Sequence, residues 1–388
     1  MIPLFKVFTA PTAAERVAEV LASGYTAQGP VVEMFETMLK DYLGEQSLLT
    51  VSSGTAALDL ACHLAGVGPG TEVISTPQTC SATNGVIANR GAKIIWADID
   101  PLTGNIDPAS VAKLVNEKTV AVMAVDWSGR LCGYKAIREA LRGDIWIIRD
   151  AAHGFGTVDK NADFTCWSFQ AIKHLSTGDG GLLLVPPSQY ERARKLRWFG
   201  LDRTKGESFR CAQDIEEVGY KYHMNDVAAA IGCANFTAGF AKWVEVDGST
   251  FQARYGEIDI LGRHRENARL LLDGLTRIQD AVSYDFANAP PFDPTSAYWV
   301  LTILVPHERD ELQAFLASRG IGSSRVHRCN DEHTAFKRVS EWRVPHPGLD
   351  AFDAAQLSIP CGWWVGEHER NTILMALFDF AEQQKRGA

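Results

Sequence analysis

The chain has 388 residues, of which 46% are hydrophobic and 22% are charged, and its formal net charge is −9 at pH 7. This is the composition of an ordinary globular protein, and its acidic balance argues against nucleic acid or an anionic membrane surface as the main partner. No run of 18 apolar residues occurs, so we expect no membrane-spanning helix, and we expect no secretory signal at the N-terminus.

Short apolar runs alternate with helix-like segments through the first half of the chain. The strands are predicted at residues 48–51, 72–76, 93–98, 119–125, 145–150, 164–169 and 181–185, and helices between them at 55–67, 110–118 and 134–143. Strands that are apolar throughout and alternate with amphipathic helices are typical of a largely parallel sheet with both faces covered. We therefore predict an α/β fold.

The pattern beyond residue 190 is mainly helical. Helices are predicted at residues 188–198, 224–242 and 250–276, followed by a strand at 297–305, a helix at 308–320 and a tail helix after 366. A chain of this length favours two domains. We expect a large α/β domain over residues 1–245 and a smaller C-terminal α+β domain over residues 246–388.

The eight cysteines are scattered through the chain and form no CxxC pair. In a chain of this size, such a pattern favours reduced thiols in the cytoplasm over a disulfide framework or a zinc site. We therefore expect a cytoplasmic protein without a bound metal.

Two polar motifs follow predicted strands, where ligands bind in open parallel sheets. The first is VSSGTAAL (51–58), which leads from a strand into a helix. Its first backbone N–H groups suit an anion, or Ser53 simply caps the helix. The second is IWIIRDAAHGFG (145–156), in which Asp150 ends an apolar strand and His153 follows it. Asp150 is either a structural carboxylate or the partner of a cationic ligand atom.

A third motif, FTCWSFQAIKHLSTGDGG (164–181), contains Lys173 among apolar neighbours. Most lysines are solvated surface charges, but an amine in apolar surroundings titrates low enough to attack a carbonyl. An anion site, a carboxylate at a strand end and such an amine are what pyridoxal phosphate requires. Its phosphate, its pyridine nitrogen and its aldehyde would meet these three groups in that order.

Six strings in chain order resemble the DegT/DnrJ/StrS family of pyridoxal-phosphate-dependent sugar aminotransferases. They are SGYTAQGPVVEMFE (23–36), SSGTAAL, RDAAHGFG, SFQAIKHLSTGDGG, VGYKYHMNDVAAAIG (218–232) and RGIGSSRVHRCNDEH (319–333). The resemblance implies the PLP-dependent transferase fold type I, with a mostly parallel seven-stranded sheet sandwiched by helices and a smaller C-terminal α+β domain. It also implies a homodimer with active sites at the interface.

The resemblance assigns the cofactor site residue by residue. Lys173 would carry the cofactor as a Schiff base and move the proton during the reaction. Asp150 would hold the pyridine nitrogen, and His153 would lie near the phenolic oxygen of the ring. The phosphate would be bound by the backbone N–H groups of Gly54 and Thr55 and by the hydroxyl of Ser168.

The sequence departs from the family pattern at two positions. Lys221 stands where many members have an asparagine that reaches the phosphate in the partner subunit, so a point charge would replace an amide there. Cys80 stands where relatives often have an aromatic residue stacked on the cofactor ring. A thinner stack, or another side chain, would have to cover that face.

Tyr25 and His327 match family positions near the sugar or its nucleotide. For Tyr25 the alternative is a turn aromatic that packs on the next helix. His327 has Arg325 and Arg328 beside it, and these arginines would either meet a diphosphate or belong to a solvated loop.

The predicted reaction moves an amino group from an amino acid, L-glutamate, to a nucleotide-linked ketosugar and makes an aminosugar. Some relatives have histidine in place of the lysine and catalyse dehydration, so Lys173 favours transamination. Three alternatives stay open: a sugar dehydratase that uses the same cofactor, an aminotransferase for a small phosphorylated or cyclic ketone, and a non-catalytic relative.

Overall fold

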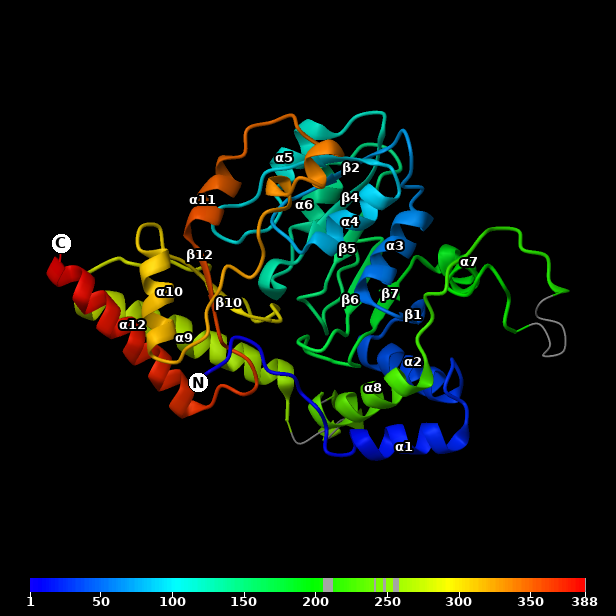
Figure 1. The fold of residues 1–388 in the computed structure, drawn as a ribbon, viewed down its shortest axis with the longest axis horizontal. Coiled ribbons are helices and arrows are strands. Elements are labelled where there is room, and N and C mark those ends of the chain that lie inside the picture. The colour runs from blue at the N-terminus through cyan, green and yellow to red at the C-terminus, as the bar shows by residue number, and fades with distance from the viewer. Residues whose placement is uncertain (205–211, 241, 247–248, 254–257, 388) are drawn as a thin grey trace.

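The computed structural model describes residues 1–204, 212–240, 242–246, 249–253 and 258–387 (Figure 1). The main sheet contains β1 (Leu48–Val51), β2 (Glu72–Ser75), β3 (Lys93–Trp96), β4 (Thr119–Val125), β5 (Trp146–Asp150), β6 (Phe164–Ser168), β7 (Gly181–Leu184) and β11 (Ser340–Trp342). Their spatial order is β1-β7-β6-β5-β4-β2-β3-β11. Neighbouring strands run parallel, except that β7 is antiparallel to both β1 and β6.

The predicted α/β fold with a largely parallel sheet is confirmed. The sheet has eight strands where we expected seven, because β11 from the C-terminal part of the chain pairs with β3. All seven predicted strands of the first half are present. Their apolar character has a simple cause: Val122 and Met123, neighbours on β4, are both fully buried in hydrophobic clusters on opposite faces of the sheet.

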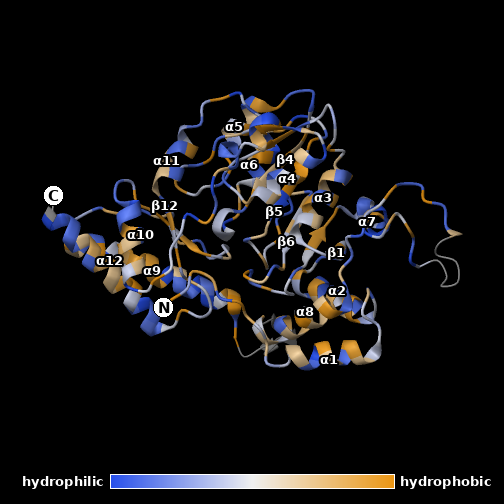
Figure 2. Ribbon diagram, viewed as in Figure 1, coloured by the Kyte–Doolittle hydropathy of each residue, from blue (hydrophilic) through white to orange (hydrophobic). Residues whose placement is uncertain are grey.

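Helices cover both faces of this sheet. They are α1 (Ala13–Ser23), α2 (Pro30–Leu43), α3 (Gly54–Leu64), α4 (Ser81–Asn89), α5 (Pro108–Leu114), α6 (Tyr134–Ala140), α7 (Tyr190–Leu196) and α8 (Asp226–Gly239), with short 3-10 turns η1 (Trp127–Gly129) and η2 (Pro187–Gln189). Side chains of α3, α4 and α7 share one cluster with the sheet, those of α5 and α6 a second, and those of α2 and α8 a third. Figure 2 shows hydrophobic and hydrophilic turns alternating along α1, as expected of a helix with one buried face.

The C-terminal part has its own hydrophobic cluster. The elements of this part of the chain are α9 (Ile260–Val282), α10 (Arg309–Ser318), α11 (Pro347–Ala355), α12 (Glu367–Gly387), the 3-10 turns η4 (Asn330–Glu332) and η5 (Phe336–Arg338), and the antiparallel pair β10 (Leu301–Leu304) and β12 (Gln356–Ile359). The helices α9 and α12 lie side by side (Figure 1), and Leu275, Ile303 and Phe380 belong to the cluster. The division of the chain at residues 245 and 246 stays a prediction. None of the described helices is long and apolar enough to cross a lipid bilayer.

The helix that we predicted at residues 250–276 is wrong in its first part. The strands β8 (Lys242–Val246) and β9 (Ser249–Ala253) pair antiparallel there, and residues 254–257 lie outside the described part. The helix begins only at Ile260, because the Asp259 side chain accepts a hydrogen bond from the Gly262 N–H (2.9 Å) and caps it. The helix predicted at 224–242 also ends early, at Gly239, and the strand β8 begins at Lys242.

Candidate active site

A cavity of about 370 Å³ lies at the carboxyl ends of β4, β5 and β6. Val125, Asp150 and Ser168, the last residues of these strands, line it, and Val125 and Asp150 are direct partners across the sheet. The start of α3, Lys173 and His153 line the same cavity. The three motifs singled out in the sequence are therefore brought together in one place, at the edge where parallel sheets bind ligands.

The start of α3 forms a backbone cradle at one side of the cavity. The Ser53 hydroxyl accepts a hydrogen bond from the Ala56 N–H (3.0 Å), so Ser53 is a helix cap. The N–H groups of Gly54 and Thr55 belong to the first turn and have no acceptor within the helix. A Cβ atom on Gly54 would lie 2.8 Å from Ser168 Cβ, and one on Gly181 would lie 2.5 Å from the Ser53 carbonyl oxygen. Only glycine fits this close approach, which leaves the N–H groups accessible to an anion.

The Asp150 carboxylate is buried, with 3% of the residue exposed. The Thr83 hydroxyl donates a hydrogen bond to its Oδ2 (2.7 Å), and the Ala152 N–H donates to its Oδ1 (3.0 Å). Burial raises the pKa of Asp150 above the ordinary aspartate value, and the two hydrogen bonds and the nearby Lys173 offset part of that rise. This carboxylate is thus oriented by two donors and suits a cationic nitrogen.

The ε-amine of Lys173 lies in the same cavity. Its backbone N–H donates to the Gln170 carbonyl (2.8 Å), in the turn that follows β6. Desolvation lowers the pKa of Lys173 from 10.5 to about 8, although the negative charge of Asp150 acts in the opposite direction. An appreciable fraction of this amine is therefore neutral near pH 8, as attack on a carbonyl requires.

An aromatic wall closes another side of the cavity. His153 stacks on Trp299 with ring centroids 4.0 Å apart, and His327 lies nearly parallel to His153 at 5.8 Å. Burial lowers the pKa of His153 well below the ordinary histidine value and that of His327 to about 4, so both imidazoles are neutral near pH 7. Their buried atoms His153 Nδ1 and His327 Nε2 have no hydrogen-bond partner. These two nitrogens are therefore free to meet a ligand.

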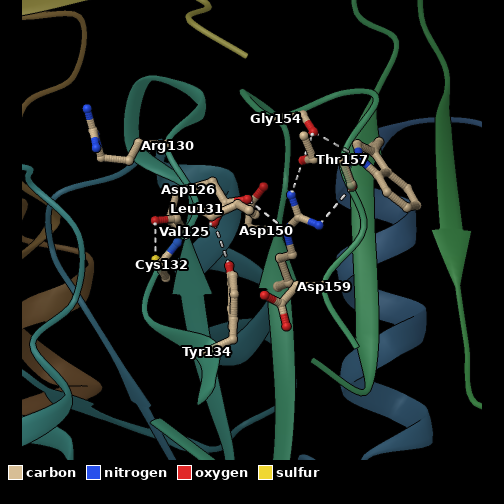
Figure 3. A network of polar contacts seen from close by, with 12 residues as sticks. Val125, Asp126, Arg130, Leu131, Cys132, Tyr134, Asp150, Gly154, Thr157 and Asp159 are labelled. Atoms are coloured by element: carbon tan, nitrogen blue, oxygen red, sulfur yellow. Dashed lines mark hydrogen bonds and ion pairs between the residues drawn. The ribbon is translucent and has the colours of Figure 1, made fainter. Parts of the chain in front are cut away.

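A buried ion pair lies beside the end of β5 and the loop that follows Asp150 (Figure 3). Arg149 Nε lies 2.7 Å from Asp126 Oδ2, and neither side chain is exposed. The Tyr134 hydroxyl donates to Asp126 Oδ1 (2.7 Å), while the Arg149 guanidinium donates to the Thr157 carbonyl (2.9 Å) and hydroxyl (2.6 Å). The Asp126 N–H also donates to the Asp150 carbonyl (3.1 Å). The network joins β4, β5 and the loop that carries His153.

Two of the predicted site residues lie outside the cavity within this chain. Tyr25 is 72% exposed and lines a separate hollow of about 190 Å³ beside α1 and α2. Lys221 is exposed on the segment whose backbone joins β1 through a hydrogen bond from the Ser52 N–H to the Tyr222 carbonyl (2.6 Å). The cavity that holds Lys173 is therefore lined by neither of them in the described structure.

The arginines beside His327 are engaged within the chain. Arg325 pairs with Asp353 and Arg328 pairs with Glu332. Each arginine thus has a carboxylate partner within the chain, and its contact with a diphosphate stays a prediction. His327 itself lines the cavity.

Among the cavity-lining residues that sequence reasoning missed, Thr83 and Trp299 contact predicted site residues. Thr83 lies 67 residues before its partner Asp150, and no spacing rule connects them. Trp299 lies in an apolar run that we interpreted only as a strand. Cys80, by contrast, lines the cavity as its position suggested.

These groups fit pyridoxal 5′-phosphate. The backbone N–H groups of Gly54 and Thr55 suit the phosphate, the Asp150 carboxylate suits the protonated ring nitrogen, and the Lys173 amine suits the aldehyde. The unpartnered Nδ1 of His153 is available for the ring oxygen. A buried polar atom without a partner and a cradle that any Cβ would fill are both features that such a ligand explains.

Comparisons with known proteins identify the family of this chain. The family model described as the DegT/DnrJ/EryC1/StrS aminotransferase family matches residues 9–377. AtS13 from Actinomadura melliaura is 34% identical, with a TM-score of 0.85 and 98% of each chain covered. The sugar aminotransferase CalS13 from Micromonospora echinospora is 30% identical, with a TM-score of 0.84, and the match covers 98% of this chain and 100% of that one.

A relative from a third organism is the spore coat polysaccharide biosynthesis protein SpsC of Bacillus subtilis (strain 168), which is 35% identical over 230 residues. That match spans 56% of this chain and 59% of SpsC, so it covers less than two thirds of the relative's length. The structural likeness identifies the fold as the PLP-dependent transferase fold type I. The chain therefore belongs to the DegT/DnrJ/EryC1/StrS aminotransferase family.

Proposed function

We propose that this protein is a pyridoxal-phosphate-dependent aminotransferase that moves the amino group of L-glutamate to a nucleotide-linked ketosugar. The observation that carries the proposal is that Lys173, Asp150 and the start of α3 line one cavity. The names of CalS13, a sugar aminotransferase, and of SpsC, a polysaccharide biosynthesis protein, support a sugar as the acceptor.

The cofactor, when bound, supplies an electron sink that lets the α-proton of an amino acid leave. The residues of this chain would bind, orient and move that proton. The cradle at Gly54 and Thr55 would anchor the phosphate, and Asp150 would keep the ring nitrogen protonated. The Lys173 amine would accept the α-proton and return it, because a pKa of about 8 makes it basic enough for the first transfer and acidic enough for the second.

Water is kept from the reacting groups by the aromatic wall. Trp299, the tryptophan of this wall, is 3% exposed. The neutral imidazoles of His153 and His327 face the cavity without adding charge to it. Such a wall supports hydrogen bonds to the hydroxyl or keto oxygens of a sugar better than a salt bridge to an anion.

We also propose a cytoplasmic homodimer whose active sites lie at the interface. The exposure of Tyr25 and Lys221 supports this, because a second copy can use side chains that this chain does not direct into its own cavity. All seven described cysteines are free, which is consistent with a reducing compartment. The eighth, Cys211, lies outside the described residues.

A sugar dehydratase is the second candidate, since it would use the same cofactor and fold. The presence of Lys173 favours transamination, because an amine at this position both recaptures the cofactor and shuttles the proton. The two reactions differ in their products: only the transaminase converts glutamate to 2-oxoglutarate in equal amounts with the aminated sugar.

The first experiment locates the cofactor. The protein is mixed with pyridoxal phosphate, reduced with borohydride and digested, and the modified peptide is identified by mass spectrometry. We expect the tag on Lys173 and its loss in Lys173→Ala, while Lys118→Ala, at an exposed position, serves as the matched control. A tag on another lysine, or no tag, would refute the assignment. The reaction is then tested with glutamate and a panel of nucleotide-linked ketosugars, where a product without new nitrogen would favour the dehydratase.

The interface is tested by mixing two variants, Lys173→Ala and Lys221→Ala. If Lys221 completes the site of the other subunit, a mixed dimer contains one intact site. We then expect activity to recover on mixing to a substantial fraction of the wild-type value. Two weakly active variants that gain nothing on mixing would contradict the proposal.

A further inference from the structure

Trp299 contacts the reacting lysine directly, yet the proposed function gives it no role beyond excluding water. The Nζ atom of Lys173 lies 3.5 Å from the centroid of the indole. The indole Nε1–H donates a hydrogen bond to the carbonyl of Ile172 (2.9 Å), the residue immediately before the lysine. The tryptophan therefore holds both the backbone and the side-chain end of this short segment.

The indole has no free face for a substrate. It is stacked on His153, with centroids 4.0 Å apart and planes inclined by 18°, and on Phe5, with centroids 4.6 Å apart and planes inclined by 27°. Only 3% of Trp299 is exposed. Besides Phe5, the indole contacts the lysine and the histidine expected at the cofactor ring, which points to a role in positioning these two groups.

The backbone on either side of this contact is held in unusual conformations. Tyr298, just before the tryptophan, has a φ of 49°, and Ser128 has a φ of 60°. Hydrogen bonds join Ser128 to the two residues that follow Tyr298. The Trp299 N–H donates to the Ser128 carbonyl (2.9 Å), and the Ser128 hydroxyl donates to the Val300 carbonyl (2.5 Å). Non-glycine residues in the left-handed region persist only where surrounding structure enforces them, and they gather at functional sites.

An ammonium group above an indole is attracted by the electrons of the ring, so the contact favours the charged amine over the neutral one. Desolvation in the cavity acts in the opposite direction. Five other titratable groups act on Lys173 from the surrounding segments: Asp150, Cys80, His153, His174 and His327. Replacing Trp299 removes none of these five groups from the protein, so a change in the pKa of Lys173 reports the loss of the indole together with its stacking on His153.

We propose that Trp299 is a positioning residue for the proposed aminotransferase reaction. Its indole holds the Lys173 amine inside the cavity whenever the amine is not joined to the cofactor, and its stacking fixes the plane of the His153 imidazole. The role of Trp299 in catalysis rests on the proposed function, whereas its contacts with Lys173 and His153 are present without cofactor.

The test uses the full-length protein without cofactor. Lys173 is acylated with acetic anhydride over a range of pH, and the modified peptide is quantified by mass spectrometry, which gives the pKa of this one amine. We expect Trp299→Leu to lower that pKa by about 0.5 to 1 pH unit, and Trp299→Phe to lower it by less, because phenylalanine attracts a cation more weakly. Trp96→Phe, at a buried tryptophan on β3, is the matched control and leaves the pKa unchanged.

An unchanged or raised pKa of Lys173 in Trp299→Leu would overturn the proposal. If the tryptophan were purely structural, its loss would only let water reach the amine, and the reduced desolvation would raise the pKa. If Trp299→Leu does not fold, Trp299→Phe is used instead: a lowered pKa of Lys173 supports the proposal, and an unchanged or raised pKa overturns it. A second measurement, on the protein with cofactor, separates kcat from KM: the variants should lose kcat at least tenfold while the KM for glutamate changes little. Failure of the aminotransferase reaction itself would leave the acylation result intact, so the two hypotheses are tested separately.

Discussion

The buried pair of Arg149 and Asp126 allows a sharp prediction about stability. In Arg149→Met, Asp126 Oδ2 loses a charged donor at 2.7 Å, and both the carbonyl and the hydroxyl of Thr157 lose donors at 2.9 and 2.6 Å. The Asp126 carboxylate stays buried, with the Tyr134 hydroxyl still bound to its other oxygen. The variant therefore contains a buried negative charge without its counterion.

Breaking a buried pair in this way costs about 3–5 kcal/mol of the free energy of unfolding. Each lost hydrogen bond from a charged donor contributes about 1.5–3 kcal/mol, so the three together already reach this range without being strictly additive. Because a whole protein is stable by only about 5–15 kcal/mol, the loss is a large fraction of the total. We expect a marked decrease in the urea midpoint of Arg149→Met.

The assay is a double-mutant cycle followed by urea unfolding and circular dichroism. Asp126→Asn is nearly isosteric and removes the charge, so the double variant Arg149→Met/Asp126→Asn contains no unpaired charge. We expect it to be more stable than Arg149→Met alone, with a coupling energy of at least about 1.5 kcal/mol. A loss below about 1 kcal/mol in Arg149→Met, or simple additivity in the double variant, would refute the reasoning.

Three further predictions concern the cofactor. Gly181→Ala places a Cβ atom 2.5 Å from the backbone oxygen at the N-cap of α3, so cofactor affinity should fall about tenfold or more in equilibrium dialysis, while Gly68→Ala, with open space around it, should not change it. Thr83→Val removes the 2.7 Å hydrogen bond to Asp150 and should weaken cofactor binding about fivefold, whereas Thr83→Ser should retain it. Covalent capture of the cofactor aldehyde should accelerate with rising pH and level off above about pH 8, where the Lys173 amine is neutral, and a rate that is constant from pH 6 to 10 would contradict this.

The main sheet could be predicted well because its physical cause is local. All seven strands predicted between residues 48 and 185 are present, with ends within two residues of the prediction. A strand buried on both faces must be apolar throughout, and that is visible in one sequence. The strand β11, with the sequence Ser-Glu-Trp, has no such pattern and enters the sheet through its pairing with β3. Pairing with a distant strand leaves no signal in three residues.

At the site, too, residues in local motifs could be predicted, and residues brought in by long-range contacts could not. Lys173, Asp150 and Gly54 lie in motifs whose chemistry can be interpreted locally, and the cavity contains all three. Trp299 comes 127 residues after Ile172, to which it is hydrogen-bonded, and its neighbours in sequence suggest only a core strand. Contacts between segments this far apart depend on the folded backbone, here on the strained turn at Tyr298. They could not have been found from residue types and spacing.

Charge balance in the cavity bears on how the cofactor is held. Among the described residues that line it, Lys173 is the one lysine or arginine, and the proposed function commits its amine to the aldehyde. His153 and His327 are neutral because their pKa values lie well below 7. Backbone N–H groups at the start of α3 would therefore bind a phosphate of about two negative charges without a cationic side chain among the described residues that line the cavity. A cation from a second copy would relieve that imbalance. This supports the proposal that Lys221 of one copy reaches the phosphate in the other, and it predicts that cofactor affinity depends on dimer formation.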